Sequence, residues 1–198
     1  MIYLVRHGQT AFNRERRLQG HLDSDLTELG RSQARAMAGL LADLVALDPP
    51  GQWRLVSSPL GRARATAEII GARLDLPVET DPRLMEISCG AWDGRLRGEI
   101  EAQAPEAFAS SGWAFRAPMG ERYETVSARL ADWLASLAPE PERRVIAVSH
   151  GISGRVLRGL YAGLTRDETV NQAVPQDAVY RLMNRQVDRF NCEPLEEA

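Results

Sequence analysis

The sequence predicts an α/β fold: a three-layer αβα sandwich whose mostly parallel central sheet carries helices on both faces. The main observation is that short apolar runs of strand length alternate with longer segments whose apolar residues recur at helical spacing. We find no repeat of fixed period, which argues against a solenoid. The length of 198 residues suits one domain with its own core, and we expect residues 1–198 to form it.

The first half of the chain contains three candidate strands and two candidate helices. The strands are short and mostly apolar, and each helix carries apolar residues on one face. In order, they are a strand over residues 2–6, a helix that Thr27 caps and Asp48-Pro49-Pro50-Gly51 ends, a strand over 53–57, a helix from Pro59 to Leu74 and a strand over 77–79. Proline is tolerated at the first turn of a helix, so Pro59 is a suitable start.

The second half begins with a segment, residues 86–120, that is rich in Gly, Ala, Ser and Pro and predicts loops with one short helix. The alternation then returns. The candidates are a helix that carries Val126, Leu130, Trp133, Leu134 and Leu137, a strand over 145–148, a helix over 152–162 and a strand over 178–183. Strands that alternate with helices in this way favour parallel pairing.

All 24 basic residues are arginine, because the chain contains no lysine. A genome-wide codon bias would produce the same composition, so the absence alone indicates no function. It does exclude a Schiff-base lysine and a lysine-containing phosphate loop. Any fixed positive charge at a site must come from arginine, which favours bidentate contacts with phosphate or carboxylate.

Bulk properties narrow the partners and the location. The net charge of −3 provides no basic field for nucleic acid, and no apolar run approaches the roughly 20 residues of a membrane span, so we expect neither partner. Cys89 and Cys192 are too few for a disulfide framework. The N-terminus lacks a signal-peptide pattern, and we therefore expect reduced cysteines and a cytoplasmic location. No cluster has zinc spacing, so we expect no metal and no cofactor.

Three predicted strands end in side chains that can bind an anion. They continue as Arg6-His7-Gly8, as Ser57-Ser58-Pro59-Leu60-Gly61-Arg62, and as Ser149-His150-Gly151 directly before a helix. Ligands bind at the carboxyl ends of strands in such sheets, glycine permits close approach to the backbone, and a helix N-terminus favours negative charge. A lone histidine at a strand end is more often structural, so the prediction depends on the joint pattern. That pattern predicts a pocket for a small dianion such as phosphate.

Five motifs extend this pattern over nearly the whole chain. They are Arg6-His7-Gly8-Gln9-Thr10 with Asn13, Gln19-Gly20 with Leu26-Thr27-Glu28-Leu29-Gly30, Ser57 to Ala63 with Thr66-Ala67, Leu84-Met85-Glu86-Ile87 with Gly90, Trp92 and Gly94, and Ser149-His150-Gly151. In this order they resemble the histidine phosphatase superfamily, in its phosphoglycerate-mutase-like branch. Phe12 stands where that family often has tryptophan, and Met119 interrupts a common Gly-Gly pair, but neither departure touches the proposed chemistry.

The resemblance implies a metal-independent phosphomonoester hydrolase that acts on a small phosphorylated metabolite through a phosphohistidine. His7 would be the nucleophile, and Glu86 would be the general acid. The residues that would hold the phosphate or add polar contacts to the substrate are Arg6, Asn13, Gln19, Gly20, Arg62, His150 and Gly151, with Arg6, Arg62 and His150 also counted as catalytic. The chemistry suits these side chains, because a neutral imidazole is nucleophilic near pH 7 and phosphoryl transfer needs mainly positioning and charge stabilisation.

Two other phosphatase patterns occur in the same chain. Cys89 to Arg95 matches the C-x₅-R spacing of cysteine-based phosphatases, but no strong strand precedes Cys89 and Asp93 would repel a phosphate. Asp23-Ser24-Asp25-Leu26-Thr27 matches the D-x-D-x-T of aspartate-nucleophile phosphatases, yet it follows a polar stretch rather than a strand. We interpret the first as an incidental loop thiol and the second as a turn leading to the Thr27 cap. His21 receives no role.

Two further functions remain possible from the sequence, a cofactor-dependent phosphoglycerate mutase and a non-catalytic phosphate-binding protein. The second is disfavoured because nucleophile, acid and arginines are all present. Against the mutase, the interval from Glu86 to His150 is short, and of Arg95, Arg97, Arg116 and Arg122, which lie there, no two are adjacent. The same interval contains aromatic residues that could form either a pocket wall or ordinary core, namely Trp92, Phe108, Trp113, Phe115 and Tyr123. The substrate and the oligomeric state cannot be predicted.

Overall fold

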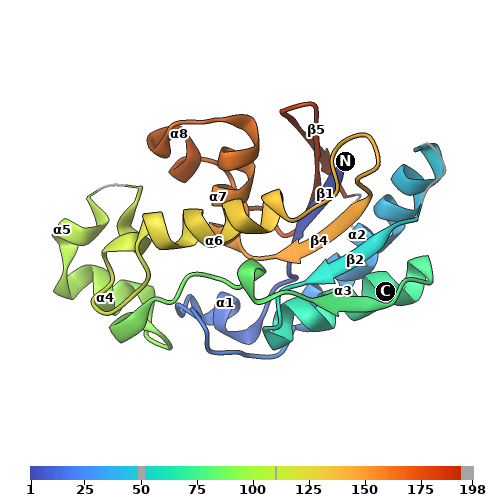
Figure 1. Cartoon of the computed structure of the whole chain (residues 1–198). Coiled ribbons are helices and arrows are strands. Elements are labelled where there is room, and N and C mark those ends of the chain that lie inside the picture. Colours follow the sequence, from blue (N-terminus) through green and yellow to red (C-terminus); the bar gives the residue numbers. More distant parts are fainter. Residues whose placement is uncertain (49–51, 110, 193–198) are drawn as a thin grey trace.

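The computed structural model describes residues 1–48, 52–109 and 111–192. A six-stranded sheet in the order β3-β2-β4-β1-β5-β6 forms its centre (Figure 1). The strands are β1 Ile2–Arg6, β2 Arg54–Ser57, β3 Val78–Thr80, β4 Val145–Ser149, β5 Ala178–Met183 and β6 Gln186–Asn191. β1 to β4 pair in parallel, and β5 and β6 add an antiparallel edge. The predicted mostly parallel α/β architecture is confirmed.

Eight α-helices and three short 3₁₀ turns surround this sheet within the described ranges. The α-helices are α1 Ala11–Glu15, α2 Glu28–Leu47, α3 Gly61–Leu74, α4 Arg97–Gln103, α5 Pro105–Phe108, α6 Tyr123–Ala135, α7 Gly151–Ala162 and α8 Arg166–Val170. The 3₁₀ turns span Pro82–Leu84, Gly90–Trp92 and Trp113–Arg116. α4 and α5 lie in a lobe beyond the ends of the strands, apart from the helices that cover the sheet (Figure 1).

The sheet separates two hydrophobic cores, as its fully buried central strands require. Along β1, Ile2 and Leu4 face a core shared with α6 and α7, whereas Tyr3 and Val5 face a core shared with α2 and α3. Successive side chains of a strand point to opposite faces, so an apolar strand can serve both layers. This alternation explains why the predicted strands are apolar throughout rather than amphipathic.

The element boundaries differ from the predicted ones mainly at helix ends. Thr27 caps α2 through a hydrogen bond from Gly30 N–H to its hydroxyl, as expected, and α2 ends before Asp48, while Pro49 to Gly51 lie outside the described residues. α3 begins at Gly61 rather than Pro59 because Leu60 is its extended N-cap. The interval 86–120 contains two short α-helices, α4 and α5, instead of one. Leu137 lies beyond the end of α6.

Three elements, α1, α8 and β6, were not predicted. β6 is an exposed edge strand with a mixed polar sequence, which gives little periodic signal. The hairpin that joins it to β5 turns at Asn184 and Arg185, both with positive φ, so it lacks the glycine that usually marks such a turn.

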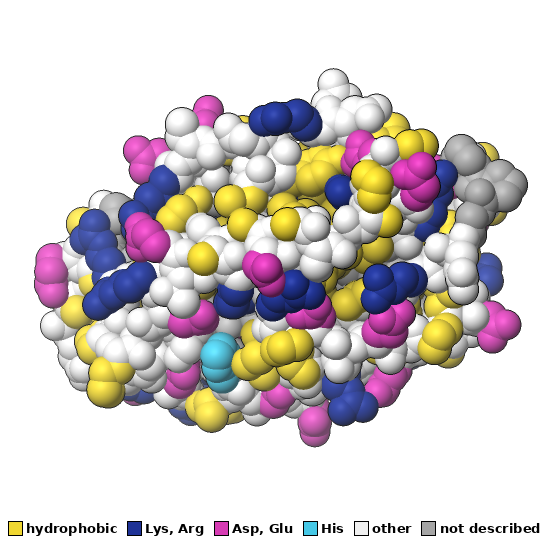
Figure 2. All heavy atoms as spheres, viewed as in Figure 1, with side chains coloured by type: hydrophobic (Ala, Val, Ile, Leu, Met, Phe, Trp, Pro, Cys, Tyr) yellow, Lys and Arg dark blue, Asp and Glu magenta, His cyan; other side chains and the backbone are white. Residues whose placement is uncertain are grey.

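The surface mixes charges of both signs. On the face shown in Figure 2, arginine and acidic side chains are interspersed rather than gathered into separate regions. Within the described residues, none of the helices has the length and apolarity that a membrane span requires.

A matched pair of substitutions in α2 tests the core on the α2–α3 side. Leu41 is fully buried, and Leu47 on the same helix is 85% exposed. Leu41→Ala should lower the free energy of unfolding by about 2–5 kcal/mol, because it removes buried methyl groups and leaves a cavity. Leu47→Ala should change it by less than about 0.5 kcal/mol. Urea unfolding followed by circular dichroism measures both, and equal effects would contradict the packing described.

Candidate active site

The carboxyl ends of β1, β2 and β4 open into one cavity of about 630 Å³. In the parallel register, Arg6 lies opposite Ser149, and Ser57 lies opposite Val148. The next residues of the three strands therefore leave the sheet at the same edge. Eight of the nine predicted site residues line the cavity: Arg6, His7, Asn13, Gln19, Gly20, Arg62, Glu86 and Gly151. The ninth, His150, is buried beside His7, with their ring centroids 5.2 Å apart.

His7 is buried at the end of β1 and held in one orientation. Its Nδ1 lies 2.8 Å from the Gly8 carbonyl oxygen. A carbonyl can only accept, so Nδ1 donates and the neutral ring has its lone pair on Nε2. Burial, and then the charges of Arg6 and Arg62, hold the pKa of His7 well below its usual value. The ring is therefore neutral at neutral pH, with the lone pair available toward the cavity.

His150 is the N-cap residue of α7 and is fully enclosed. Its Nε2 lies 2.8 Å from the Ser58 hydroxyl, whereas its buried Nδ1 has no hydrogen-bond partner in the described part of the chain. Burial first, and then the Arg62 charge, hold the pKa of His150 well below its usual value. Ser58 belongs to a predicted motif, but sequence reasoning gave it no separate role.

Backbone carbonyls anchor the two arginines of the site. Arg6 Nη1 donates to the Val174 carbonyl at 2.6 Å, and Arg62 donates to the Leu22 and Gly20 carbonyls at 2.7 and 2.8 Å. The Nε–H of each arginine is buried and unpartnered among the described residues. Desolvation lowers the pKa of Arg6 to about 10, so it remains charged at neutral pH. Each guanidinium is thus fixed on one side and has a free donor on the other.

Asp23 explains the D-x-D-x-T pattern. Its carboxylate accepts from the Arg62 guanidinium at 2.8 Å and from the Gly61 N–H at 2.6 Å. It therefore caps the N-terminus of α3 and orients Arg62, which supports the interpretation of this stretch as a turn rather than a nucleophile loop.

Gly20, whose carbonyl accepts from Arg62, has φ +50°, and a Cβ there would clash with the Asp93 side chain, so glycine is required.

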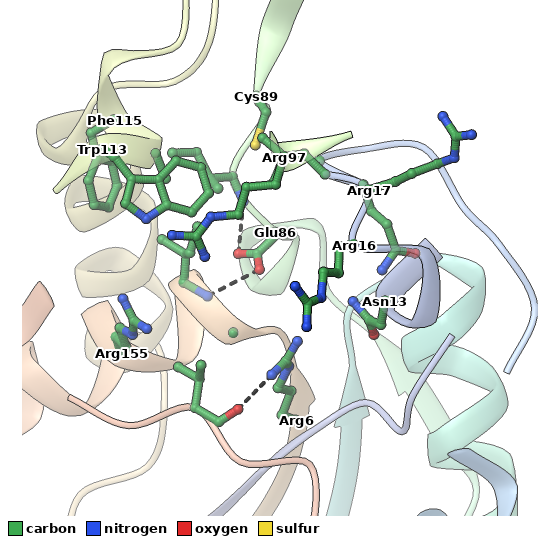
Figure 3. A pocket seen from close by; sticks show the side chains of 18 of the residues that line it. Arg6, Asn13, Arg16, Arg17, Glu86, Cys89, Arg97, Trp113, Phe115 and Arg155 are labelled. Carbon is green, nitrogen blue, oxygen red and sulfur yellow. Dashed lines mark hydrogen bonds between the residues drawn. The ribbon is translucent and has the colours of Figure 1, made fainter. Parts of the chain in front are cut away.

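Glu86 reaches the first turn of α7. Its Oε1 accepts from Ser153 N–H and from its neighbour Ile87 N–H and lies 3.1 Å from the Ser153 hydroxyl, which donates to the Met85 carbonyl, and its Oε2 accepts from Ile152 N–H at 3.1 Å. The Ile152 and Ser153 amides are among those that a helix start leaves free. The carboxylate is therefore fixed in orientation at the mouth of the cavity (Figure 3).

The backbone of Glu86 is held as firmly as its side chain. Its carbonyl accepts from His21 Nε2 at 2.9 Å and from Arg129 Nη2 at 3.3 Å. Arg129 also donates to Glu121 and to the Arg83 carbonyl. His21 and Arg129 thus position Glu86 from outside the cavity, a role that sequence reasoning missed because neither residue lies in a strand-end motif.

Asn13 and Gln19 use their side chains partly within the protein. Asn13 Oδ1 accepts from the Thr10 N–H at 3.2 Å and from Gln176 Nε2 at 3.0 Å, and Gln19 Oε1 accepts from the Ser24 hydroxyl at 3.3 Å. Each amide oxygen is therefore committed to the surrounding loops. Both residues line the cavity, where their amide groups are placed to contact a ligand.

The C-x₅-R alternative lacks the geometry of a cysteine nucleophile. Burial is the main cause that raises the pKa of the Cys89 thiol well above its usual value, which leaves it protonated. Arg95 donates to Gln103 at 2.6 Å, on the exposed side of α4. Among the described residues, no group of three or more His, Cys, Asp or Glu is arranged to hold a metal ion.

The strand-end motifs did not indicate four further arginines that line the cavity: Arg16, Arg17, Arg97 and Arg155 (Figure 3). Of these cavity-lining arginines, only Arg97 lies in the interval from Glu86 to His150. A count of the cations in that interval therefore does not give the positive charge of the cavity. The sequence could have indicated Arg155, because this residue lies four positions after Gly151 and therefore on the same face of the helix. Arg16 follows α1, which the sequence did not predict.

The aromatic residues of the 86–120 segment form a connected stack. The rings of Trp92, Phe108 and Trp113 follow one another with centroids 5.7 and 4.9 Å apart. Trp92 is buried in the core, whereas Trp113 both packs against the core and lines the cavity. Phe115 also lines the cavity and meets Tyr123 edge to face. The segment thus supplies both core and cavity wall.

Comparison with known proteins gives consistent matches. The family model for the histidine phosphatase superfamily (branch 1) matches residues 2–194. A probable phosphoglycerate mutase GpmB from Erwinia tasmaniensis is 36% identical over 167 residues, which cover 82% of this chain and 75% of that protein. A glucosyl-3-phosphoglycerate phosphatase from Mycobacterium tuberculosis is 39% identical over 163 residues, which cover 76% of this chain and 70% of that protein.

Solved structures agree with this assignment of fold. A mycobacterial glucosyl-3-phosphoglycerate phosphatase in complex with VO3 aligns with a TM-score of 0.77 at 31% identity, over 97% of this chain and 99% of that one. The Bacillus stearothermophilus protein YhfR aligns with a TM-score of 0.76 at 30% identity, over 94% of this chain and 93% of that one.

The two buried histidines should make stability depend on pH. Their folded-state pKa values lie below the unfolded value of about 6.5, so the unfolded chain binds more protons as the pH falls through that value. Their contribution to stability is complete above about pH 6.5 and is lost as the pH falls below it. His150→Gln should therefore lose less unfolding free energy than the wild type between about pH 7.5 and about pH 5. Urea titrations at the two pH values measure this, and parallel losses would contradict it.

Proposed function

The chain belongs to the histidine phosphatase superfamily, and on that premise we propose that it is a phosphomonoester hydrolase that acts on a small phosphorylated metabolite through a phosphohistidine intermediate. One observation carries the proposal: the Nε2 lone pair of His7 lies in a site with three buried nitrogen atoms that have no partner among the described residues. These are Arg6 Nε, Arg62 Nε and His150 Nδ1. Buried polar atoms without partners are rare in native proteins, and three of them around one cavity are consistent with a site for a ligand.

A phosphate group would satisfy these donors and would be positioned for attack by His7. The two guanidiniums and the His150 N–H would hold its non-bridging oxygens and stabilise the charge that spreads over them during transfer. The amide of Gly151, at the start of α7, would add a further donor to an anion there. Fixed arginine charges take the part that metal ions play in other phosphoryl-transfer sites, so we propose that the reaction is metal-independent.

Two steps complete the reaction. His7 Nε2 attacks phosphorus, the bond between phosphorus and the ester oxygen breaks, and Glu86 in its protonated form donates a proton to that oxygen as it leaves. Water then attacks the phosphohistidine, Glu86 accepts a proton from the water, and phosphate departs. Oε1 of Glu86 already accepts hydrogen bonds from two backbone amides and Oε2 from one, so we assign the proton to Oε2.

The relatives support a small phosphorylated substrate. The VO3 complex belongs to a mycobacterial glucosyl-3-phosphoglycerate phosphatase, and the same enzyme has been solved with inorganic phosphate. Because the chain is also similar to GpmB proteins, which are named as probable phosphoglycerate mutases, mutase activity is the second candidate function. A single domain, a cytoplasmic location and the lack of nucleic-acid and membrane partners stay predictions from the sequence.

The first test compares two nucleophile candidates in the presence of EDTA. We expect the wild type to release phosphate from p-nitrophenyl phosphate and from 3-phosphoglycerate with EDTA present. His7→Ala should lower kcat by about 10⁴-fold or more, because no other side chain can take the phosphoryl group. The matched control Cys89→Ser should retain activity within about threefold. Phosphate release is measured colorimetrically, and a His7→Ala variant near the wild-type rate would contradict the assignment.

The same assay separates hydrolase from mutase. When 3-phosphoglycerate is supplied with 2,3-bisphosphoglycerate, a hydrolase releases phosphate and forms little 2-phosphoglycerate. Isomerisation that exceeds phosphate release would establish the mutase instead.

A second prediction concerns Glu86→Gln, which keeps the size of the side chain but cannot transfer a proton. A general acid matters most when the leaving oxygen is strongly basic. The variant should slow hydrolysis of an alkyl phosphate by about 10²–10⁴-fold and that of p-nitrophenyl phosphate by less than about tenfold. Steady-state rates with both esters measure the difference. Equal losses for the two would indicate that Glu86 only supports the structure of the α7 start.

A further inference from the structure

Three arginines face the cavity without taking part in the proposed reaction. Arg16, Arg97 and Arg155 reach it from the loop after α1, from α4 and from α7. In Figure 3 their guanidinium groups point toward the space in front of Glu86, whereas Arg17 points away. Arg17 is instead held by Glu15 and by the Gly94 carbonyl.

Arg155 is already fixed in place. Its Nη1 donates to the Val170 carbonyl at 2.9 Å, and its buried Nε has no partner in the ranges that the structure describes. Such a guanidinium loses little further conformational freedom when it binds an anion. Glu86, Arg97 and Arg155 all line the same cavity.

Arg16 and Arg97 are tied to each other through the backbone. The Arg97 N–H donates to the Arg16 carbonyl at 2.9 Å, and Arg16 has φ +59° as the C-cap of α1. The Arg97 guanidinium lies over the Trp113 ring at 5.1 Å and the Phe108 ring at 5.6 Å. The aromatic stack therefore supports a cation beside the cavity, which gives these rings a use beyond core packing.

The charges of the cavity do not balance. Six arginines line it, against the two carboxylates of Glu86 and Glu101. The ion pairs found between described residues include none of Arg16, Arg97 and Arg155. A single phosphate dianion held by Arg6 and Arg62 would leave this second group of cations without a counter-charge.

We infer that Arg16, Arg97 and Arg155 form a second anion subsite, which binds a carboxylate or a second phosphate on the leaving group of the substrate. The inference rests on the proposed function and names its substrate class, a phosphomonoester that carries a second anionic group. Glu86 lines the same cavity as both groups of cations, and the ester oxygen would leave beside it. The part of the substrate beyond that oxygen therefore meets the three arginines, whose planar donors suit carboxylate and phosphate.

Two pairs of esters test the subsite, because the members of each pair differ chiefly in the second anion. They are 3-phosphoglycerate against glycerol 3-phosphate for the carboxylate, and fructose 1,6-bisphosphate against fructose 6-phosphate for the phosphate. The wild type should favour the anionic member of at least one pair by about tenfold or more in kcat/KM, as expected for charge-assisted hydrogen bonds. The pair that shows the preference identifies the source of the anion.

Variants of the three arginines should abolish that preference. Arg155→Gln and Arg97→Gln remove charge, and Arg16→Asn does so with a residue that tolerates the left-handed backbone at this position. Each should lower the preference to about threefold or less, mainly through the rate with the anionic ester. Arg166→Gln is the matched control, because Arg166 is exposed on α8, pairs with Glu124 and lies outside the cavity. It should preserve the wild-type preference.

The outcomes separate this inference from the proposed function. A wild type that hydrolyses all esters without preference overturns the subsite and leaves the hydrolase intact, as does a preference that survives in all three variants. If no ester is hydrolysed, the proposed function fails. Calorimetric binding of 3-phosphoglycerate and glycerol 3-phosphate, and of the fructose 1,6-bisphosphate and fructose 6-phosphate pair, then still decides the subsite. Equal dissociation constants within both pairs would overturn it.

Discussion

The placement of two arginines, the buried Arg62 and the half-buried Arg6, beside two buried histidines is the constraint on which the rest of the site depends. A buried guanidinium needs partners, because its desolvation is otherwise unfavourable. The protein supplies backbone carbonyls from two loops, one around Gly20 to Leu22 and one at Val174. The backbone conformations of both loops are therefore constrained by their hydrogen bonds to the two arginines. Since each carbonyl set satisfies one side of a guanidinium, the other side remains available to a ligand.

The same positive charges determine the state of the histidines and give Glu86 its electrostatic role. Burial first, and then the charges of Arg6 and Arg62, disfavour a positive charge on His7, which keeps its pKa low and its lone pair free. Burial lowers the pKa of Arg6 and of Arg155, and the charge of Glu86 opposes that shift, so the carboxylate stabilises a cation of each group. Its own position is set from both sides, by the first amides of α7 on its carboxylate and by His21 and Arg129 on its carbonyl. In this position Glu86 can act both as the proposed general acid and as a counter-charge to the arginines.

The sequence predicts the sheet and the strand-end residues because both depend on local signals. Parallel strands bring their carboxyl ends to one edge, so the strand pattern alone is enough to place Arg6, His7 and His150 together. The anchors of the arginines could not be predicted, because a backbone carbonyl has no residue signature. The second group of cations was missed for another reason. Arg16, Arg97 and Arg155 come from three distant segments, and only the backbone bond between Arg16 and Arg97 and the turn of α7 bring them to one cavity.

The extra cations also change how hydrolase and mutase can be distinguished. The short interval between Glu86 and His150 favours the hydrolase, but the cavity collects positive charge from outside that interval as well. Cations bind an anionic substrate in either enzyme, so they cannot separate the two. What separates them is the fate of the phosphohistidine, since a mutase must exclude water while its intermediate reorients. A cavity of about 630 Å³ is much larger than a phosphate and has room for water beside a small substrate. On the proposed mechanism, that room would admit the water that hydrolyses the phosphohistidine.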